Sequence, residues 1–288
     1  FSILISFNSY GETKSDYYSN GQIKSETNYK DGKFDGKYTL WYANGQIWKE
    51  ENYKDGKKDG KLTEWSEKGE KWHDRNFING NLVSKTNYTY YDNDLNKSEK
   101  NYKNGKLDGK STEWYENGQI WIEENYKDGK LDGKMTKWYE NGQIQKDWNY
   151  KDGKKDGKLH TWHENGQKSS ERYFIADKSH GLQNRWFENG KKQSEMNYLN
   201  GKKEGNLTIW FENGKINETK NYKNNKRYGK YTRSGVDGTL YEERNYKNDV
   251  VVDQTVFSYH GNGLINSETK YKNGKLDGKQ TKWFENGQ

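Results

Sequence analysis

The chain of 288 residues is basic and rich in aromatic side chains, with a formal net charge of +7, 28% apolar residues and 16% Trp, Tyr and Phe. An apolar content this low is typical of disordered chains, but disordered chains are poor in aromatic residues. The composition therefore predicts a thin folded protein and disfavours an ordinary two-domain globular enzyme. The absence of cysteine excludes disulfides and thiolate metal sites. The modest charge does not indicate a nucleic-acid-binding protein.

Residues 1–7, FSILISF, form the only clearly apolar run in the sequence, and the small residues Ser9 and Gly11 follow it. This arrangement is typical of the end of a secretory signal peptide. We therefore expect residues 1–11 to be a signal-peptide remnant and the mature protein to be exported to the periplasm, the envelope or the medium. Without such a leader the protein would be cytoplasmic. The alternative interpretation of these residues is a strand that caps the first hairpin.

A repeat of 24 or 25 residues occupies the remainder of the chain, and its anchor is an Asn that is usually followed by Gly. Only Asn93 lacks this glycine, because Asp94 follows it. Asn-Gly between alternating apolar and polar residues is a strong signal for a β-hairpin. The anchors are Asn20, Asn44, Lys68, Asn93, Asn117, Asn141, Asn165, Asn189, Asn213, Asp237, Asn262 and Asn286.

A second turn signal follows each anchor by about 11 residues in most repeats, for example Asp31-Gly32 and Asp128-Gly129. Each repeat is thus predicted to contain two short strands and two tight turns of type I′, which need a positive φ at both central residues. Across the anchor turn we expect Trp41 to face Trp48 and Tyr42 to face Ile47.

A column of tryptophans stands three residues before the anchors. Its main interpretation is packing between repeats, and its functional interpretation is a linear aromatic platform that binds a partner protein. A single-stranded nucleic acid is a disfavoured partner, because acidic residues are interleaved with the lysines. The candidate partner-binding residues are Trp41, Trp65, Trp114, Trp138, Trp162, Trp186, Trp210 and Trp283.

The repeat units resemble a known family. GKLTEWSEKGE (60–70), LDGKSTEWYENGQ (107–119) and LDGKMTKWYENGQ (131–143) are similar to the variant MORN repeat, which is often grouped with the YwqK-like antitoxin component of bacterial toxin–antitoxin modules. The resemblance extends from about residue 12 to 288 and implies a partner protein, namely a cognate toxin. Residues 80–100 and 225–262 depart from the pattern, the latter with Ser234 in place of the repeat Trp.

The repeat predicts an all-β fold, an elongated single-layer antiparallel sheet of stacked β-hairpins over residues 12–288. Because the sequence stops within the turn at 286–288, we expect an array that is truncated at the C-terminus. Its stability would come from contacts between neighbouring repeats rather than from a thick core.

The sequence contains no pattern that predicts catalysis. The string at 104–111 is one residue too short for a Walker-type loop, and His160 and His163 are expected on opposite faces of a strand. We therefore predict a non-catalytic protein-binding scaffold without cofactor, metal or small-molecule substrate. The alternative is an exported envelope or cell-surface protein with a structural or adhesive role. Binding to an anionic membrane surface is a minor alternative.

Overall fold

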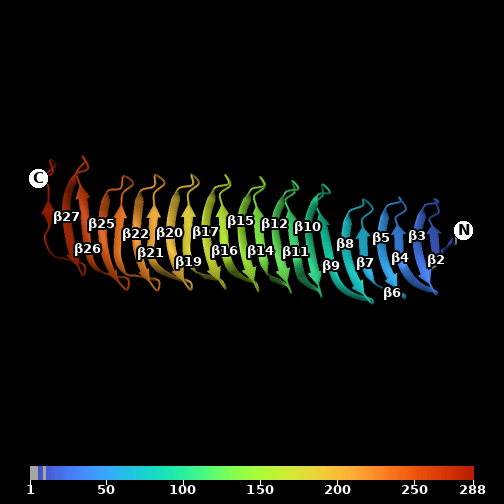
Figure 1. The fold of residues 1–288 in the computed structure, drawn as a ribbon. Helices are drawn as coiled ribbons and strands as arrows, with labels where there is room; N and C mark the ends of the chain where they lie inside the picture. Colours follow the sequence, from blue (N-terminus) through green and yellow to red (C-terminus); the bar gives the residue numbers. More distant parts are fainter. Residues whose placement is uncertain (1–5, 9–10) are drawn as a thin grey trace. The chain divides into compact units, whose positions relative to one another are not determined.

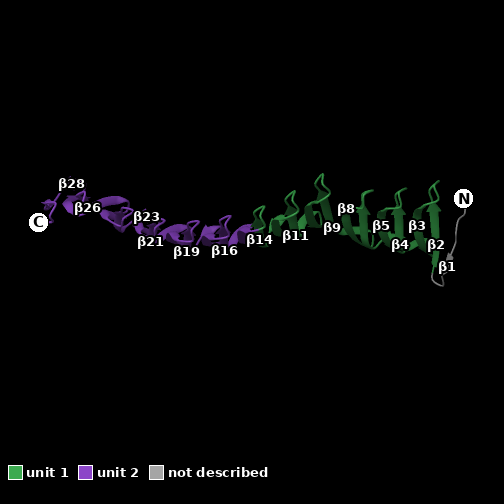
Figure 2. Ribbon diagram, turned by 90° about the horizontal axis from the view of Figure 1, so that it is seen from above, with its two compact units in different colours: residues 1–142 green, residues 143–288 purple. Residues whose placement is uncertain are grey.

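The structure is a computed structural model that describes residues 6–8 and 11–288, and in this part of the chain it contains strands and turns but no helix. The residues group into two compact units, 1–142 and 143–288 (Figure 2). The proposed signal-peptide remnant lies largely outside the described residues. Its residues 6–8 form strand β1, which pairs antiparallel with β2.

The first unit is an open antiparallel sheet in which each strand pairs with its neighbours in the chain (Figure 1). The short strands β6 and β13 are separated from β7 and β14 only by a bulge at a glycine of positive φ, such as Gly60 at 102°. The strands are β1 Ser6–Asn8, β2 Gly11–Tyr17, β3 Ile23–Lys30, β4 Lys33–Trp41, β5 Ile47–Lys54, β6 Lys57–Lys58, β7 Gly60–Trp65, β8 Lys71–Ile78, β9 Asn81–Tyr90, β10 Asn96–Lys103, β11 Lys106–Trp114, β12 Ile120–Lys127, β13 Lys130–Leu131 and β14 Gly133–Trp138.

The second unit repeats this arrangement, so that the all-β class and the antiparallel hairpins are confirmed in both units. Its strands are β15 Ile144–Lys151, β16 Lys154–Trp162, β17 Lys168–Ile175, β18 Lys178–Ser179, β19 Gly181–Trp186, β20 Lys192–Leu199, β21 Lys202–Trp210, β22 Ile216–Lys223, β23 Lys226–Arg227, β24 Gly229–Ser234, β25 Leu240–Lys247, β26 Val250–Tyr259, β27 Ile265–Lys272, β28 Lys275–Leu276 and β29 Thr281–Lys282.

The second turn of each repeat has the predicted conformation. In the turn between β3 and β4, Asp31 and Gly32 have φ values of 51° and 73°. Both central residues are therefore left-handed, as a type I′ turn requires. The same pair of positive φ values is found at Ala176 and Asp177, where the glycine is missing.

The anchor turn differs from the prediction. Only the glycine has a positive φ, 87° at Gly45, whereas Asn44 does not, because its Oδ1 accepts a hydrogen bond of 2.9 Å from the Gln46 amide. The Tyr42 amide donates to the Gln46 carbonyl at 2.8 Å, so the loop spans five residues. This is the pattern of a turn that closes with a left-handed glycine and a bulge.

The five-residue loop changes the register next to it. Trp41 pairs with Ile47 and Leu40 pairs with Lys49, so that Trp48 is the extra residue of a bulge. The expected pairs of Trp41 with Trp48 and of Tyr42 with Ile47 are therefore wrong.

The two stretches that depart from the sequence pattern keep the repeat geometry. Asp94 adopts the left-handed conformation of the missing glycine, with φ of 64°, and Asn93 donates to the Glu116 carbonyl at 3.0 Å. Around Ser234, the Gly235 amide donates to the Thr239 carbonyl at 2.8 Å, as in the other anchor turns.

Side chains of most repeats donate hydrogen bonds to the main chain of the next repeat. The Tyr42 hydroxyl donates to the Trp65 carbonyl at 2.8 Å, and the Tyr115 hydroxyl donates to the Trp138 carbonyl at 2.9 Å. The anchor amides add a second row of such bonds, for example from Asn117 to the Glu140 carbonyl at 3.2 Å. Because these contacts reach only the adjacent repeat, they couple nearest neighbours.

One face of each sheet carries the few buried apolar side chains, and we call it the core face. It is defined by Leu62 in the first unit and by Leu159, Met196 and Tyr231 in the second, which are between 2% and 7% exposed. Cross-strand pairs such as Leu159 with Arg172 and Met196 with Leu207 place these residues in one row across the strands. Charged side chains share this row with the apolar ones.

Glu51 is the most buried charge of the first unit, with 2% of its side chain exposed. Its carboxylate accepts hydrogen bonds from Tyr53 at 2.6 Å and Lys58 at 3.0 Å, and it contacts Lys49 at 2.5 Å. Burial by itself would raise the pKa of Glu51, but these three partners outweigh it and hold the pKa below its ordinary value.

Replacement of Glu51 by Gln tests this network. Because two lysines lose their buried counter-charge, we expect β5 and β7 to be destabilised by about 1–3 kcal/mol in urea unfolding at pH 7. The lowered pKa stabilises the wild type above the ordinary Glu pKa of about 4.3, and this stability is lost as the pH falls through the folded pKa. Glu51→Gln should flatten that acid dependence. Glu50→Gln, on the opposite face, is the control, and an equal effect of both variants would contradict the assignment.

The tyrosine hydroxyl ladder is tested by a reciprocal pair of variants. Tyr115→Phe removes the bond to Trp138 and should cost about 0.5–1.5 kcal/mol, whereas Phe187→Tyr should gain a similar amount by bonding the Trp210 carbonyl. Hydrogen exchange should change in the repeats next to each substitution and stay constant elsewhere in the chain. A uniform change along the chain would rule out nearest-neighbour coupling.

Candidate interaction surface

The predicted tryptophan column lies on the face opposite the core face, and we call this surface the tryptophan face. It is defined in the first unit by Trp41, Trp65, Trp114 and Trp138 and in the second by Trp162, Trp186, Trp210 and Trp283. Each of these side chains is half-buried, and all but Trp283 end a strand just before an anchor turn. Part of every indole ring is therefore open to a partner.

The buried part of the column packs on the preceding repeat. Lys168 Nζ lies 5.6 Å from the Trp186 ring and Lys192 Nζ lies 5.7 Å from the Trp210 ring, in both cases across the repeat boundary. Tyr90, which takes the column position in its repeat, likewise donates to the Lys71 carbonyl of the preceding repeat at 3.0 Å. The column thus contributes to repeat packing, in agreement with its main interpretation from the sequence.

Threonines and ion pairs fill the tryptophan face between the indole rings. Thr39 and Thr63 are only 4% and 5% exposed. Lysine and acidic side chains pair across the strands, as Lys61 with Asp74 at 3.0 Å and Lys230 with Glu243 at 2.6 Å. Most charges of this face are therefore neutralised locally, which lowers the cost of covering it with a partner.

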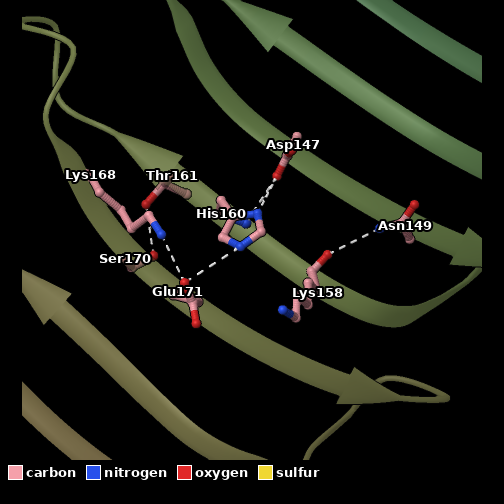
Figure 3. Close-up of polar contacts among 8 residues, drawn as sticks. All are labelled: Asp147, Asn149, Lys158, His160, Thr161, Lys168, Ser170 and Glu171. Carbon is pink, nitrogen blue, oxygen red and sulfur yellow. Dashed lines mark hydrogen bonds and ion pairs between the residues drawn. The ribbon is translucent and has the colours of Figure 1, made fainter.

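His160 lies within such a network on the tryptophan face of the second unit (Figure 3). Its Nδ1 is 2.9 Å from Asp147 Oδ1 and its Nε2 is 3.6 Å from Glu171 Oε2, to which Lys168 donates at 2.8 Å. The contact with Lys168 lowers the pKa of Glu171, and the His160 charge acts in the same direction. Burial alone would raise this pKa, but its effect is smaller. Alternating charges of this kind fix the strands relative to one another.

His163 does not join this network, because its Nε2 is 3.0 Å from the Trp186 carbonyl, where repeats such as those of Tyr42 and Tyr115 place a tyrosine hydroxyl. Over residues 6–8 and 11–288, no group of three or more His, Cys, Asp or Glu side chains lies where it could hold a metal ion. No helix in this part of the chain is long and apolar enough to cross a membrane.

Trp48 and Trp72 are exposed aromatic residues that the sequence did not indicate as candidate partner-binding residues, with 40% and 44% of their surface accessible. They follow the first residue of their strands, at the bulge next to the anchor turn, and point to the core face, where the Trp48 ring packs 6.0 Å from that of Tyr42. The signal that could have found them is the bulge, which places Trp48 on the face opposite Trp41.

The family model of the MORN repeat variant matches six segments of the chain, residues 13–31, 34–55, 107–128, 131–152, 179–200 and 203–224. No curated protein matches the chain. The matched segments all end at a type I′ turn, and each contains one anchor turn with strand residues on either side.

Solved structures show only low similarity. The complex of TcdB2, TccC3 and Cdc42 is similar at 11% identity and a TM-score of 0.27, over 90% of this chain and 14% of that one. The Tc holotoxin pore of Photorhabdus luminescens is 12% identical with a TM-score of 0.26, over 95% of this chain and 17% of that one. A porin-like protein from Bacteroides uniformis is 9% identical with a TM-score of 0.14, over 93% of this chain and 92% of that one. The chain thus spans less than one fifth of the length of the first two of these structures.

The repeat geometry is the same inside and outside the six matched segments, since the unmatched repeats at Asn93 and Asp237 keep the anchor-turn hydrogen bonds. The chain thus contains six segments that match the MORN repeat variant, and its unmatched repeats share their anchor-turn geometry.

Proposed function

We propose that this chain is a non-catalytic scaffold that binds another protein along the tryptophan face. The observation that carries the proposal is the half-exposed tryptophan that eight of the twelve repeats present on a surface whose charges are paired. Tryptophan is among the residues most enriched at the energetic centres of protein interfaces. Paired rim charges cost little to cover and add specificity.

The repeat spacing supports binding by several repeats at once. Two strands per repeat separate successive tryptophans by about 10 Å. A stable interface covers about 800 Å² on each partner, which is more than one repeat offers. A partner would therefore span several consecutive tryptophans, and its affinity would depend on several of them together.

The resemblance to YwqK-like antitoxins favours a toxin as the partner. In this role the tryptophan face would cover the toxin and block its active site without any chemistry of its own. The second candidate role is that of an exported envelope or surface protein with a structural or adhesive function, and the apolar run FSILISF at residues 1–7 favours it. The two roles differ in the compartment in which the chain acts.

Fractionation of the source cells separates these roles. If the chain neutralises a toxin in the cytosol, we expect the unprocessed protein in the cytosolic fraction. If it is exported, mass spectrometry of the mature protein should find a start near Glu12 in the envelope or medium fraction.

The tryptophan face is tested with two matched double variants. Trp41→Ser with Trp65→Ser changes the tryptophan face, and Ser234 shows that the repeat accepts serine at this position. Trp48→Ser with Trp72→Ser changes the core face in the same repeats. With a partner isolated from the source cells and then purified, the first variant should weaken binding at least about tenfold and the second should leave it unchanged.

The proposal fails if the core-face variant weakens binding while the tryptophan-face variant does not. Circular dichroism of both variants checks that each remains folded.

A further inference from the structure

The core face of the second unit carries two arginines without a counter-charge. Arg172 is on β17 and Arg185 is on β19, and they line the same groove of about 490 Å³. Within the described residues, neither guanidinium has a carboxylate within 4.0 Å or donates a side-chain hydrogen bond. The carboxylates of Glu188 and Glu212 also line this groove but lie beyond that distance.

Other repeats show what a cation at the position of Arg172, seven residues after the anchor, normally contacts. In each of them a carboxylate of the same face neutralises the charge. The pairs are Arg75 with Glu64 at 3.0 Å, Lys100 with Glu113 at 2.7 Å, Lys220 with Glu218 at 2.7 Å and Arg244 with Glu242 at 2.6 Å. Arg172 is the exception to this rule.

Hydroxyl groups and a second arginine take the place of these carboxylates around Arg172. Ser170 occupies the position of Glu218 and Glu242, and its direct cross-strand partners are Thr161 on one side and Arg185 on the other. Thr161 Oγ1 lies 2.7 Å from Ser170 Oγ and 2.6 Å from Ser169 Oγ. Three hydroxyls and two guanidiniums therefore share one groove.

The two arginines are diagonal neighbours across adjacent strands, because Ser170 pairs with Arg185 and Arg172 is two residues further along β17. Diagonal neighbours are about 7–8 Å apart at the backbone, within reach of long side chains. Burial and the charge of Arg185 lower the pKa of the Arg172 guanidinium. The repulsion between them would be relieved by an anion held between them.

Gln183 adds a further donor to the same surface. Its side-chain Nε2 is buried and has no hydrogen-bond partner among the described residues, and it lines an adjoining groove with both arginines. The groups that converge here are thus mostly donors, and an acceptor-rich ligand would satisfy them.

We propose that Arg172 and Arg185, with the hydroxyls of Thr161, Ser169 and Ser170, bind the phosphate group of a small molecule. Planar guanidiniums present paired N–H groups that match the oxygens of a phosphate, and hydroxyls donate to the remaining oxygens. The groove is open and larger than inorganic phosphate, so that a phosphate monoester fits it as well as the free anion. This site lies on the core face and is independent of protein binding on the tryptophan face.

Calorimetric titration of the full chain with inorganic phosphate, glycerol phosphate and succinate tests the proposal. We expect saturable binding of phosphate, and binding weakened about tenfold or more in Arg185→Gln. Arg233→Gln is the matched control, because Arg233 is the exposed arginine at the same repeat position and pairs across the strands with Glu218. This variant should bind phosphate as the wild type does.

Ser170→Glu separates loss of the site from loss of the fold. It restores the carboxylate that Glu218 and Glu242 provide in their repeats, so it should abolish phosphate binding while raising the thermal midpoint of unfolding. Tighter binding of glycerol phosphate than of inorganic phosphate would identify an organic phosphate as the ligand. Equal binding of the two would identify the free phosphate anion as the ligand. Absence of saturable phosphate binding, stronger binding of succinate, or equal weakening by Arg233→Gln would overturn the proposal.

Discussion

The hydrogen bond that a side chain of one repeat donates to the main chain of the next is the constraint on which this structure depends. A single two-stranded hairpin is marginal in water. Tyrosine hydroxyls such as those of Tyr42 and Tyr115, and the amides of the anchor asparagines, tie most hairpins to their successors at the anchor-turn edge. These bonds and the strand pairing replace the thick core that a chain with 28% apolar residues cannot build.

The two faces of each sheet carry different side chains and have different roles. On the core face, apolar residues such as Leu62 and Leu159 share the surface with charged side chains, of which Glu51 is deeply buried among three partners. On the tryptophan face, the half-buried indoles both pack on the preceding repeat and remain accessible. A residue in this column can therefore hold repeats together and bind a partner, and these two roles are compatible.

Sequence reasoning predicted the period, the type I′ turns and the place of the tryptophan column, because each depends on local residue chemistry. It did not predict the anchor turn, since Asn-Gly suits both a two-residue turn and a longer loop that closes at a left-handed glycine. That choice adds the bulge at Trp48 and shifts the pairing of Trp41 to Ile47. The meeting of Arg172 and Arg185 could not be predicted either, because it depends on register between strands rather than on sequence spacing.

Native-state hydrogen exchange of the wild-type chain at increasing urea concentrations tests most directly the claim that neighbouring repeats are coupled through these bonds. We predict graded opening, in which the repeats of Phe187 and Phe211, which lack the ladder hydroxyl, exchange at lower free energy than those of Tyr42 and Tyr115. Exchange of all strands at one common free energy would contradict it.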